Sequence, residues 1–153
     1  MLLWLLLPIL VAWPAGVILV VVGAYASAGM NQRALRSEVP ENVEGLRTAE
    51  RAYDAAFDEF VPCGVWPRAL EELDRSAVGW DAPPDCYQRL GWVPDGDVRG
   101  TYRVDVVSRA GDPFPDMDFV VHGWSDVDGD GEAAHYTATR STKAVMLTDD
   151  EVR

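Results

Sequence analysis

The chain has 153 residues, of which 25 are acidic and 13 basic, and it carries a formal net charge of −12 at pH 7. Once the uncharged first residues are set aside, the remainder is large enough for one domain with one hydrophobic core. A surface with this negative charge repels nucleic acid and anionic lipid, so we expect no nucleic-acid partner.

The chain opens with an uncharged, apolar segment, Leu2–Met30. A helix of this length would measure roughly 43 Å, and the hydrocarbon core of a bilayer is roughly 30 Å thick. We therefore predict a transmembrane anchor helix at residues 1–30. Two alternatives stay open: a secretory signal cleaved near Ala26 or Ala28, where small residues alternate, and a helix buried in the core.

Two features bear on the orientation of this anchor, and they point in opposite directions. Arg33 and Arg36 are the first basic residues after the apolar segment, and the positive-inside rule would keep the rest of the chain in the cytoplasm. Cys63 and Cys86 are the only cysteines, and an isolated pair in a small exported domain is typical of a disulfide. Such a bridge closes a loop of about 24 residues and stabilises the fold by about 3 kcal/mol. We favour an extracytoplasmic domain.

Apolar residues recur at spacings of three and four in the next segment, as in a helix with one buried face. They are Val43, Leu46, Ala49, Tyr53, Phe57 and Phe60. The charged residues between them, Glu50 included, fall mostly off this stripe and are expected to face solvent. Residues 31–61 are thus predicted to continue the helix and to pack on a sheet. Pro40 either begins this helix or kinks a longer one.

Five prolines interrupt the helical pattern in residues 62–100, which indicates a connecting region that contains both cysteines and a short helical candidate at Pro67–Arg75. Residues 101–153 then show the apolar alternation of an antiparallel sheet. The predicted strands lie around Tyr102–Val106, Phe119–Val121, Tyr136–Ala138 and Lys143–Thr148. A helix followed by an antiparallel meander gives an α+β fold.

Three aspartates alternate ahead of a glycine in this last region: Asp126, Asp128, Asp130 and Gly131. The spacing matches positions 1, 3, 5 and 6 of a calcium loop, in which carboxylates supply oxygen ligands and glycine permits a sharp turn. The twelfth position is Thr137 rather than an acid, so Glu132 or a backbone carbonyl would complete the calcium site. The alternative is a solvated hairpin turn, where Asp and Gly are common.

The two histidines flank this motif. A hairpin that turns about Asp128–Gly129 would place His122 opposite His135, and Val121 opposite Tyr136 on the other face. Such a pair can bind a transition metal, or repel when both rings are protonated. The alternative is two ordinary, partly exposed strand residues.

Enzyme motifs are absent from the sequence. It has no Gly-x-Ser-x-Gly, no phosphate-binding glycine loop and no His-Glu-x-x-His, and we expect no enzymatic activity. Four tryptophans are expected mainly in the core or over the helix, with a binding patch as the alternative: Trp66, Trp80, Trp92 and Trp124.

Three segments occur in a fixed order along most of residues 33–139. The stretch Arg36–Tyr53 directly follows the apolar segment; Leu90-Gly91-Trp92-Val93-Pro94 comes next, and Asp126-Val127-Asp128-Gly129-Asp130-Gly131 comes last. This order resembles that of bacterial type IV pilins and pseudopilins. The resemblance implies a long N-terminal membrane helix, a small antiparallel sheet domain outside the membrane, and contacts with other pilin-like subunits or with pilus or secretion assembly proteins.

The amino-terminal segment departs from the pilin pattern. Pilins have a basic leader, a cleavage motif and a glutamate near the mature amino terminus, and residues 1–30 show none of these. We therefore expect a single-pass inner-membrane protein, with a periplasmic or extracellular C-terminal domain, that is not processed or polymerised in the usual way. The second hypothesis is an exported binding module, cleaved near Ala26 or Ala28, with a calcium-binding loop.

Overall fold

The computed structural model describes residues 35–108 and 117–148. The predicted anchor at residues 1–30 lies outside the described residues. The described part begins with a long helix, residues 35–57. The elements that follow are β1 (Cys63–Trp66), the 3-10 helix η1 (Leu70–Glu72), α2 (Asp85–Leu90), β2 (Thr101–Ser108), β3 (Met117–Ser125), β4 (Ala134–Thr139) and β5 (Val145–Met146). Within residues 35–108 and 117–148, no helix is both long enough and apolar enough to cross a bilayer.

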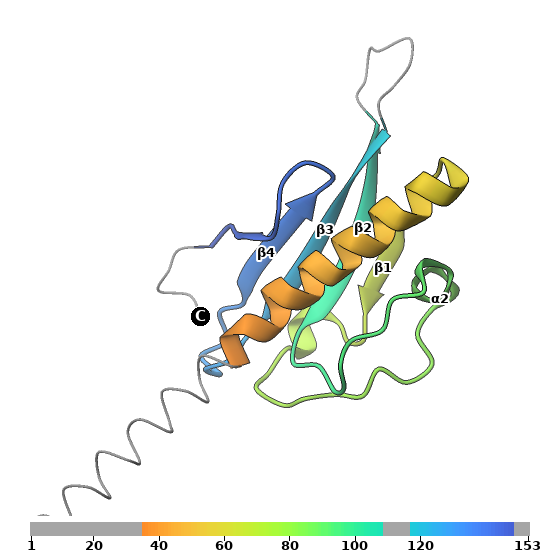
Figure 1. Ribbon diagram of the computed structural model, residues 1–153. Helices are drawn as coiled ribbons and strands as arrows, with labels where there is room; N and C mark the ends of the chain where they lie inside the picture. Colours follow the sequence, from red (N-terminus) through yellow and green to blue (C-terminus); the bar gives the residue numbers. More distant parts are fainter. Residues whose placement is uncertain (1–34, 109–116, 149–153) are drawn as a thin grey trace, which may run out of the picture. The chain divides into compact units, whose positions relative to one another are not determined.

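The strands form one antiparallel sheet of five strands in the order β1-β2-β3-β4-β5, and the long helix lies across one face of it (Figure 1). This arrangement confirms the α+β prediction and is pilin-like in architecture. The first strand was not predicted: β1 lies between Pro62 and Pro67, inside the region expected to be a connection, and its pairing with β2 is irregular between Cys63 and Trp66. At Pro67–Arg75 the predicted short helix is only the single turn of η1.

The long helix approaches the sheet closely because the sheet presents glycine where the two meet. Val39, Val43 and Leu46 are fully buried on the helix face that contacts the sheet. A Cβ atom added to Gly123 of β3 would lie 2.5 Å from Cγ2 of Val43, and one added to Gly100, just before β2, would lie 2.6 Å from Cγ2 of Val39. Both distances are far below van der Waals contact, so side chains at these positions would hold the helix away from the sheet.

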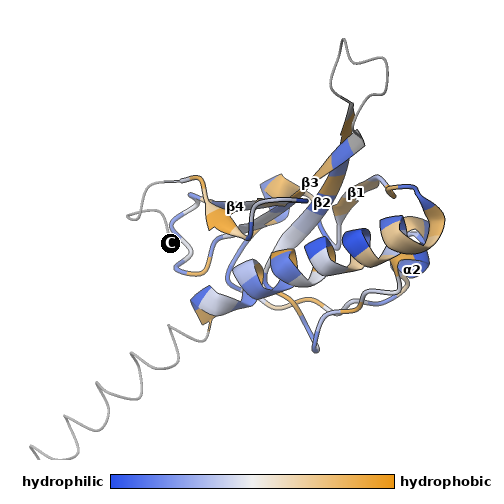
Figure 2. Ribbon diagram, turned by 45° about the horizontal axis from the view of Figure 1, so that its top comes forward, coloured by the Kyte–Doolittle hydropathy of each residue, from blue (hydrophilic) through white to orange (hydrophobic). Residues whose placement is uncertain are grey.

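Two predictions about this helix were wrong. Phe57 is 65% exposed, because the helix ends there and Phe60 fills the core instead, with its ring 5.0 Å from that of Phe119. Glu50 is fully buried and Arg47 is only 7% exposed, whereas both were expected to face solvent. Pro40 lies inside the helix, which already includes residues 35–39. The side turned away from the sheet carries exposed polar residues among small apolar ones (Figure 2), such as Thr48, Arg51 and Ala52.

Polar side chains on the helix flank hold the turn between β4 and β5. Arg47 donates from Nε to the carbonyl oxygen of Thr139 at 2.7 Å and forms an ion pair with Glu44 at 2.5 Å. Glu44 in turn accepts the backbone N–H of Ala144 at 3.2 Å. These contacts join residues about a hundred positions apart, so the helix and the last hairpin are fixed to each other by charge-assisted hydrogen bonds as well as by burial.

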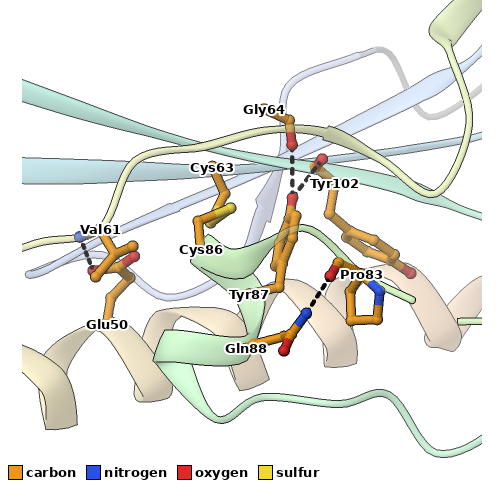
Figure 3. The surroundings of a disulfide bond; sticks show 9 residues. All are labelled: Glu50, Val61, Cys63, Gly64, Pro83, Cys86, Tyr87, Gln88 and Tyr102. Carbon is orange, nitrogen blue, oxygen red and sulfur yellow. Dashed lines mark hydrogen bonds between the residues drawn. A yellow bond between two sulfur atoms is a disulfide. The ribbon is translucent and has the colours of Figure 1, made fainter. Parts of the chain in front are cut away.

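The expected disulfide is present: Cys63 of β1 is bonded to Cys86 of α2 (Figure 3). Beside it, the hydroxyl of Tyr87 lies 2.8 Å from the carbonyl oxygen of Tyr102 and 3.0 Å from that of Gly64. Its single proton serves one carbonyl at a time or is shared between them. The disulfide and this buried tyrosine together attach α2 to β1 and β2.

Glu50 is the buried acid at the end of the helix stripe, next to the disulfide region (Figure 3). Its Oε2 accepts the backbone N–H of Val61 at 3.2 Å, and among the described residues no donor reaches Oε1. Burial raises the pKa of Glu50 from 4.5 to about 7, with a smaller contribution from Asp54, and the Val61 hydrogen bond only partly opposes this rise. Below about pH 7 the folded protein therefore favours the protonated carboxyl.

We predict that Gly123→Ala destabilises the domain by about 1–3 kcal/mol, because the new methyl group overpacks the contact with Val43. Gly64→Ala is the matched control, since a Cβ atom there meets no atom within 4 Å, and it should stay within about 0.5 kcal/mol of wild type. Urea unfolding of the three proteins measures both. Equal stability of the two variants would contradict this account of the helix–sheet contact.

We also predict that the buried Glu50 makes the stability of the domain depend on pH. Since its pKa is about 7 in the folded state and 4.5 in the unfolded state, the folded protein binds the extra proton between these values, and its free energy of unfolding falls as pH rises from about 4.5 to 7. The loss should be about 2–3 kcal/mol. Glu50→Gln should remove this part of the pH dependence and be the more stable protein at pH 8, whereas the exposed Glu72→Gln should keep it. Urea unfolding at pH 5, 6, 7 and 8 tests this; identical slopes in all three proteins would argue against a protonated Glu50.

Candidate functional sites on the sheet

The residues singled out in the sequence gather at two places on the sheet. The aspartates lie in the connection between β3 and β4, residues 126–133, which we call the acidic turn. The histidines lie on β3 and β4 on the face opposite the long helix, which we call the outer face. The two places adjoin each other along the chain but use different chemistry, so each is described separately.

Asp126 organises the acidic turn from inside. It is only 4% exposed, and its Oδ1 and Oδ2 accept the backbone N–H groups of Gly129 at 2.7 Å and of Gly131 at 3.0 Å. Both glycines have positive φ, 77° and 88°, a conformation that side-chain-bearing residues rarely adopt. The sequence suggested a short two-residue turn at Asp128–Gly129. The structure instead has a longer loop, residues 126–133, whose backbone is hydrogen-bonded to the buried Asp126 carboxylate.

The turn brings three carboxylates together. Oxygen atoms of Asp126, Asp128 and Asp130 lie within 4.8 Å of one another, so this cluster could bind a metal ion. Glu132, expected to complete a calcium site, is not among the carboxylates that lie this close; its backbone N–H instead donates to Asp130 Oδ1 at 2.8 Å. Each oxygen of Asp126 accepts one amide and keeps a second lone pair, so the hydrogen bonds within the turn are compatible with a metal ligand role.

A hollow lies beside the turn, between it and residues 73–76. Its wall includes Arg75, whose aliphatic carbon Cδ would be 2.5 Å from a Cβ atom on Gly129. Arg75 thus packs against the turn and brings a positive charge near the three carboxylates. This charge offsets part of their mutual repulsion and competes with a cation for them.

The register of the β3–β4 hairpin differs from the predicted one by two residues. Trp124, not His122, pairs with His135, and Val121 pairs with Ala138 rather than with Tyr136. His122 pairs with Thr137, so the two histidines are diagonal neighbours on the outer face. A shift of two keeps every side chain on its predicted face, which is why the histidines still meet.

The two imidazole rings are in direct contact. Nδ1 of His122 lies 3.0 Å from Nε2 of His135, and Nε2 of His122 lies 3.3 Å from Oδ2 of Asp105 on β2. Burial lowers the pKa of both histidines, and the nearby positive charge of Arg103 lowers both further; at His135, His122 also contributes to the lowering. Both rings are therefore kept neutral to a lower pH than free histidine.

Trp124 and Arg103 complete this group, and the sequence interpretation missed the part played by Arg103 and Asp105. The Trp124 indole stacks on His135 with ring centroids 4.6 Å apart, and the Arg103 guanidinium lies 5.4 Å from the Trp124 ring centroid. Arg103 also forms an ion pair with Asp105 at 2.7 Å. Arg103 and Asp105 alternate along β2, so both lie on the same face of the sheet as His122. This alternation in the sequence could have predicted that they lie near the histidines.

The other tryptophans surround the core rather than form a surface patch. Trp80 and Trp92 make edge contacts with each other and with Tyr102, and Nε1 of Trp92 lies close above Gly45 of the long helix. Trp66 packs against the same core from β1. Trp124 alone among these four lies on the outer face.

Comparison of the chain with protein-family models, with curated proteins and with solved structures gives no match.

Proposed function

We propose that the protein is a membrane-anchored, pilin-like structural or assembly subunit that displays an acidic domain outside the cytoplasmic membrane and has no enzymatic activity. The observation that carries this proposal is the placement of the long helix. The helix includes residue 35, five residues beyond the end of the apolar segment at Met30, and its buried residues Val39, Val43 and Leu46 belong to the core that it shares with the sheet. A chain leaving a membrane through this helix would lead straight into the core of the domain.

Three further features support the proposal of a membrane-anchored, pilin-like subunit. The Cys63–Cys86 disulfide is typical of an oxidising compartment outside the cytoplasm. The antiparallel meander follows the helix along the chain, as the resemblance to pilins implies. The strong negative charge keeps such a domain away from the anionic bilayer surface. The partners we propose are other pilin-like subunits, or proteins that assemble a pilus or a secretion pseudopilus.

We predict that the full chain, expressed in a bacterial host, is recovered from the inner-membrane fraction with an intact amino terminus. Leu19→Arg with Val20→Arg should abolish this retention, because each arginine near the middle of a spanning helix costs about 2.5–3.5 kcal/mol. The matched control, Leu19→Ala with Val20→Ala, should stay in the membrane. Fractionation with intact-mass measurement gives the result.

A soluble chain that begins near Ser27 or Gly29 would contradict the anchor and favour the exported binding module. Protease treatment of spheroplasts tests the orientation in the same preparation, because a domain outside the membrane is digested and a cytoplasmic one is protected. Two free thiols in the native protein would argue for the cytoplasmic orientation.

We also propose that the acidic turn binds calcium, a function that either the subunit or the exported module can have. The close approach of three carboxylates in the turn favours it, and hard oxygen ligands suit this ion. Asp126 would contribute from its buried position, and Asp128 and Asp130 from the solvent side. Backbone carbonyls and water would supply the remaining ligands that calcium needs.

We predict that calcium raises the melting temperature of the wild-type protein by several degrees relative to a chelator, since a ligand at 100 times its Kd stabilises the folded state by about 2.7 kcal/mol. Asp128→Asn with Asp130→Asn should remove this rise. Asp95→Asn with Asp97→Asn makes the same charge change at exposed positions elsewhere and should preserve it. A melting temperature that calcium and chelator leave equal in wild type would count against the site.

A further inference from the structure

The two histidines of the outer face form a hydrogen-bonded pair, which we call the histidine pair. Nδ1 of His122 lies 3.0 Å from Nε2 of His135, and the ring centroids are 5.2 Å apart, so the two rings meet edge to edge. Nε2 of His122 lies 3.3 Å from the carboxylate of Asp105, which accepts its hydrogen and leaves the lone pair of this ring on Nδ1. His135 therefore donates from Nε2 to His122.

Successive protons have different effects on this pair. A first proton can bind Nδ1 of His135, the nitrogen outside the contact, and the charged ring still donates to its partner. A second proton must take the lone pair that remains, on Nδ1 of His122. Both facing nitrogens then carry hydrogen and both rings are positive, so a contact at 3.0 Å becomes repulsive. Only the second proton breaks the pair, and the two rings titrate as one coupled unit.

The surroundings of the pair oppose its protonation. Burial lowers the pKa of both histidines, and the positive charge of Arg103 on β2 lowers both further, whereas Asp105, also on β2, only partly opposes this at His122. Trp124 of β3 is uncharged, and β5 presents apolar side chains. Because both pKa values in the folded state lie below the usual 6.5, the unfolded chain binds more protons below pH 6.5, and the contact loses stability as pH falls through this range.

The ring of His135 is the more weakly held of the two. His122 lies on β3, which is paired on both sides, and its ring is also held by Asp105. Within residues 35–108 and 117–148, the His135 ring has one hydrogen bond, the one to His122, and it stacks on Trp124 with ring centroids 4.6 Å apart. Repulsion within the pair would therefore move the His135 ring off the Trp124 indole.

The backbone of His135 also holds the last strand. Leu147 donates its N–H to the carbonyl oxygen of His135 at 2.8 Å, and His135 donates its own N–H to Oγ1 of Thr148 at 3.3 Å. β5 has only two residues, Val145–Met146, so these bonds are a large part of its attachment. We propose that the histidine pair is an acid-sensitive latch. Its hydrogen bond keeps the outer face closed, and double protonation releases the His135 ring from Trp124 and loosens the end of β5.

The test is a titration of the full-length protein in detergent from pH 7.5 to pH 4, followed by nuclear magnetic resonance. We expect the imidazole signals of the pair to report two separate protonation steps. The first step should leave the indole N–H signal of Trp124 unchanged, and the second should shift it. With the second step, hydrogen exchange at the Leu147 amide should rise roughly tenfold beyond the chemical effect of pH, because its hydrogen bond to His135 opens.

Three variants separate the latch from other effects of acid. His135→Gln keeps a side chain that can donate to His122 but cannot be protonated, so it should abolish the changes at Trp124 and Leu147. Arg103→Gln removes a positive charge beside the rings, so the second step and the Trp124 shift should move together to higher pH. Arg51→Gln removes the same charge from an exposed position on the long helix and should leave the titration as in wild type.

The wild-type titration decides the proposal even if a variant does not fold. The latch is overturned if both rings become protonated while the signals of Trp124 and Leu147 stay as at neutral pH. It is also overturned if the pair takes up no second proton above pH 4. A folded His135→Gln protein that shows the wild-type change at Leu147 would assign the change to another acid-sensitive group and overturn it as well.

Discussion

The close contact between the long helix and the sheet is the constraint on which the other features of the domain depend. Val39 and Val43 occupy the space that side chains on Gly100 and Gly123 would fill, so the helix lies low enough to bury Leu46 and, one turn further, Glu50. At this depth Arg47 and Glu44 reach the backbone of the last hairpin, and Trp92 lies against Gly45. A methyl group added at either glycine would strain these contacts, because they all depend on how close the helix lies to the sheet.

Glu50 shows what this depth costs. The chain turns back after the helix ends at residue 57, so Val61, just before β1, lies against Glu50 and donates its backbone N–H to Oε2. The Glu50 carboxylate satisfies that N–H, which would otherwise be a buried donor with no acceptor, but the same burial makes the charged form unfavourable. The Cys63–Cys86 disulfide follows two residues after Val61. Glu50 therefore holds the residue that leads into β1, and the disulfide holds the first residue of β1 itself.

The sequence predicted the parts of this fold that depend on periodicity and did not predict those that depend on single contacts. Alternation located β2, β3 and β4, and the isolated cysteine pair indicated the disulfide. β1 is a short, irregular strand between two prolines, and its pairing with β2 outweighs a local pattern typical of a connection. The histidine contact was predicted from a register that is two residues off, and it survives because side-chain direction repeats every two residues. The correct register required knowing that Asp126 turns inward to bind Gly129 and Gly131.

The division of the sheet into two faces bears on how a pilin-like subunit of this kind would make contacts. The inner face is covered by the long helix together with Trp80 and Trp92, and the exposed side of the helix mixes polar residues such as Arg51 with apolar ones, Phe57 among them. In the proposed subunit, the apolar segment before residue 31 is the longest stretch of sequence available for contacts driven by apolar burial, and exposed side chains such as Phe57 and Val93 add to it. In the function that we propose, one chain separates anchoring, at its amino terminus, from calcium binding, at the acidic turn between β3 and β4.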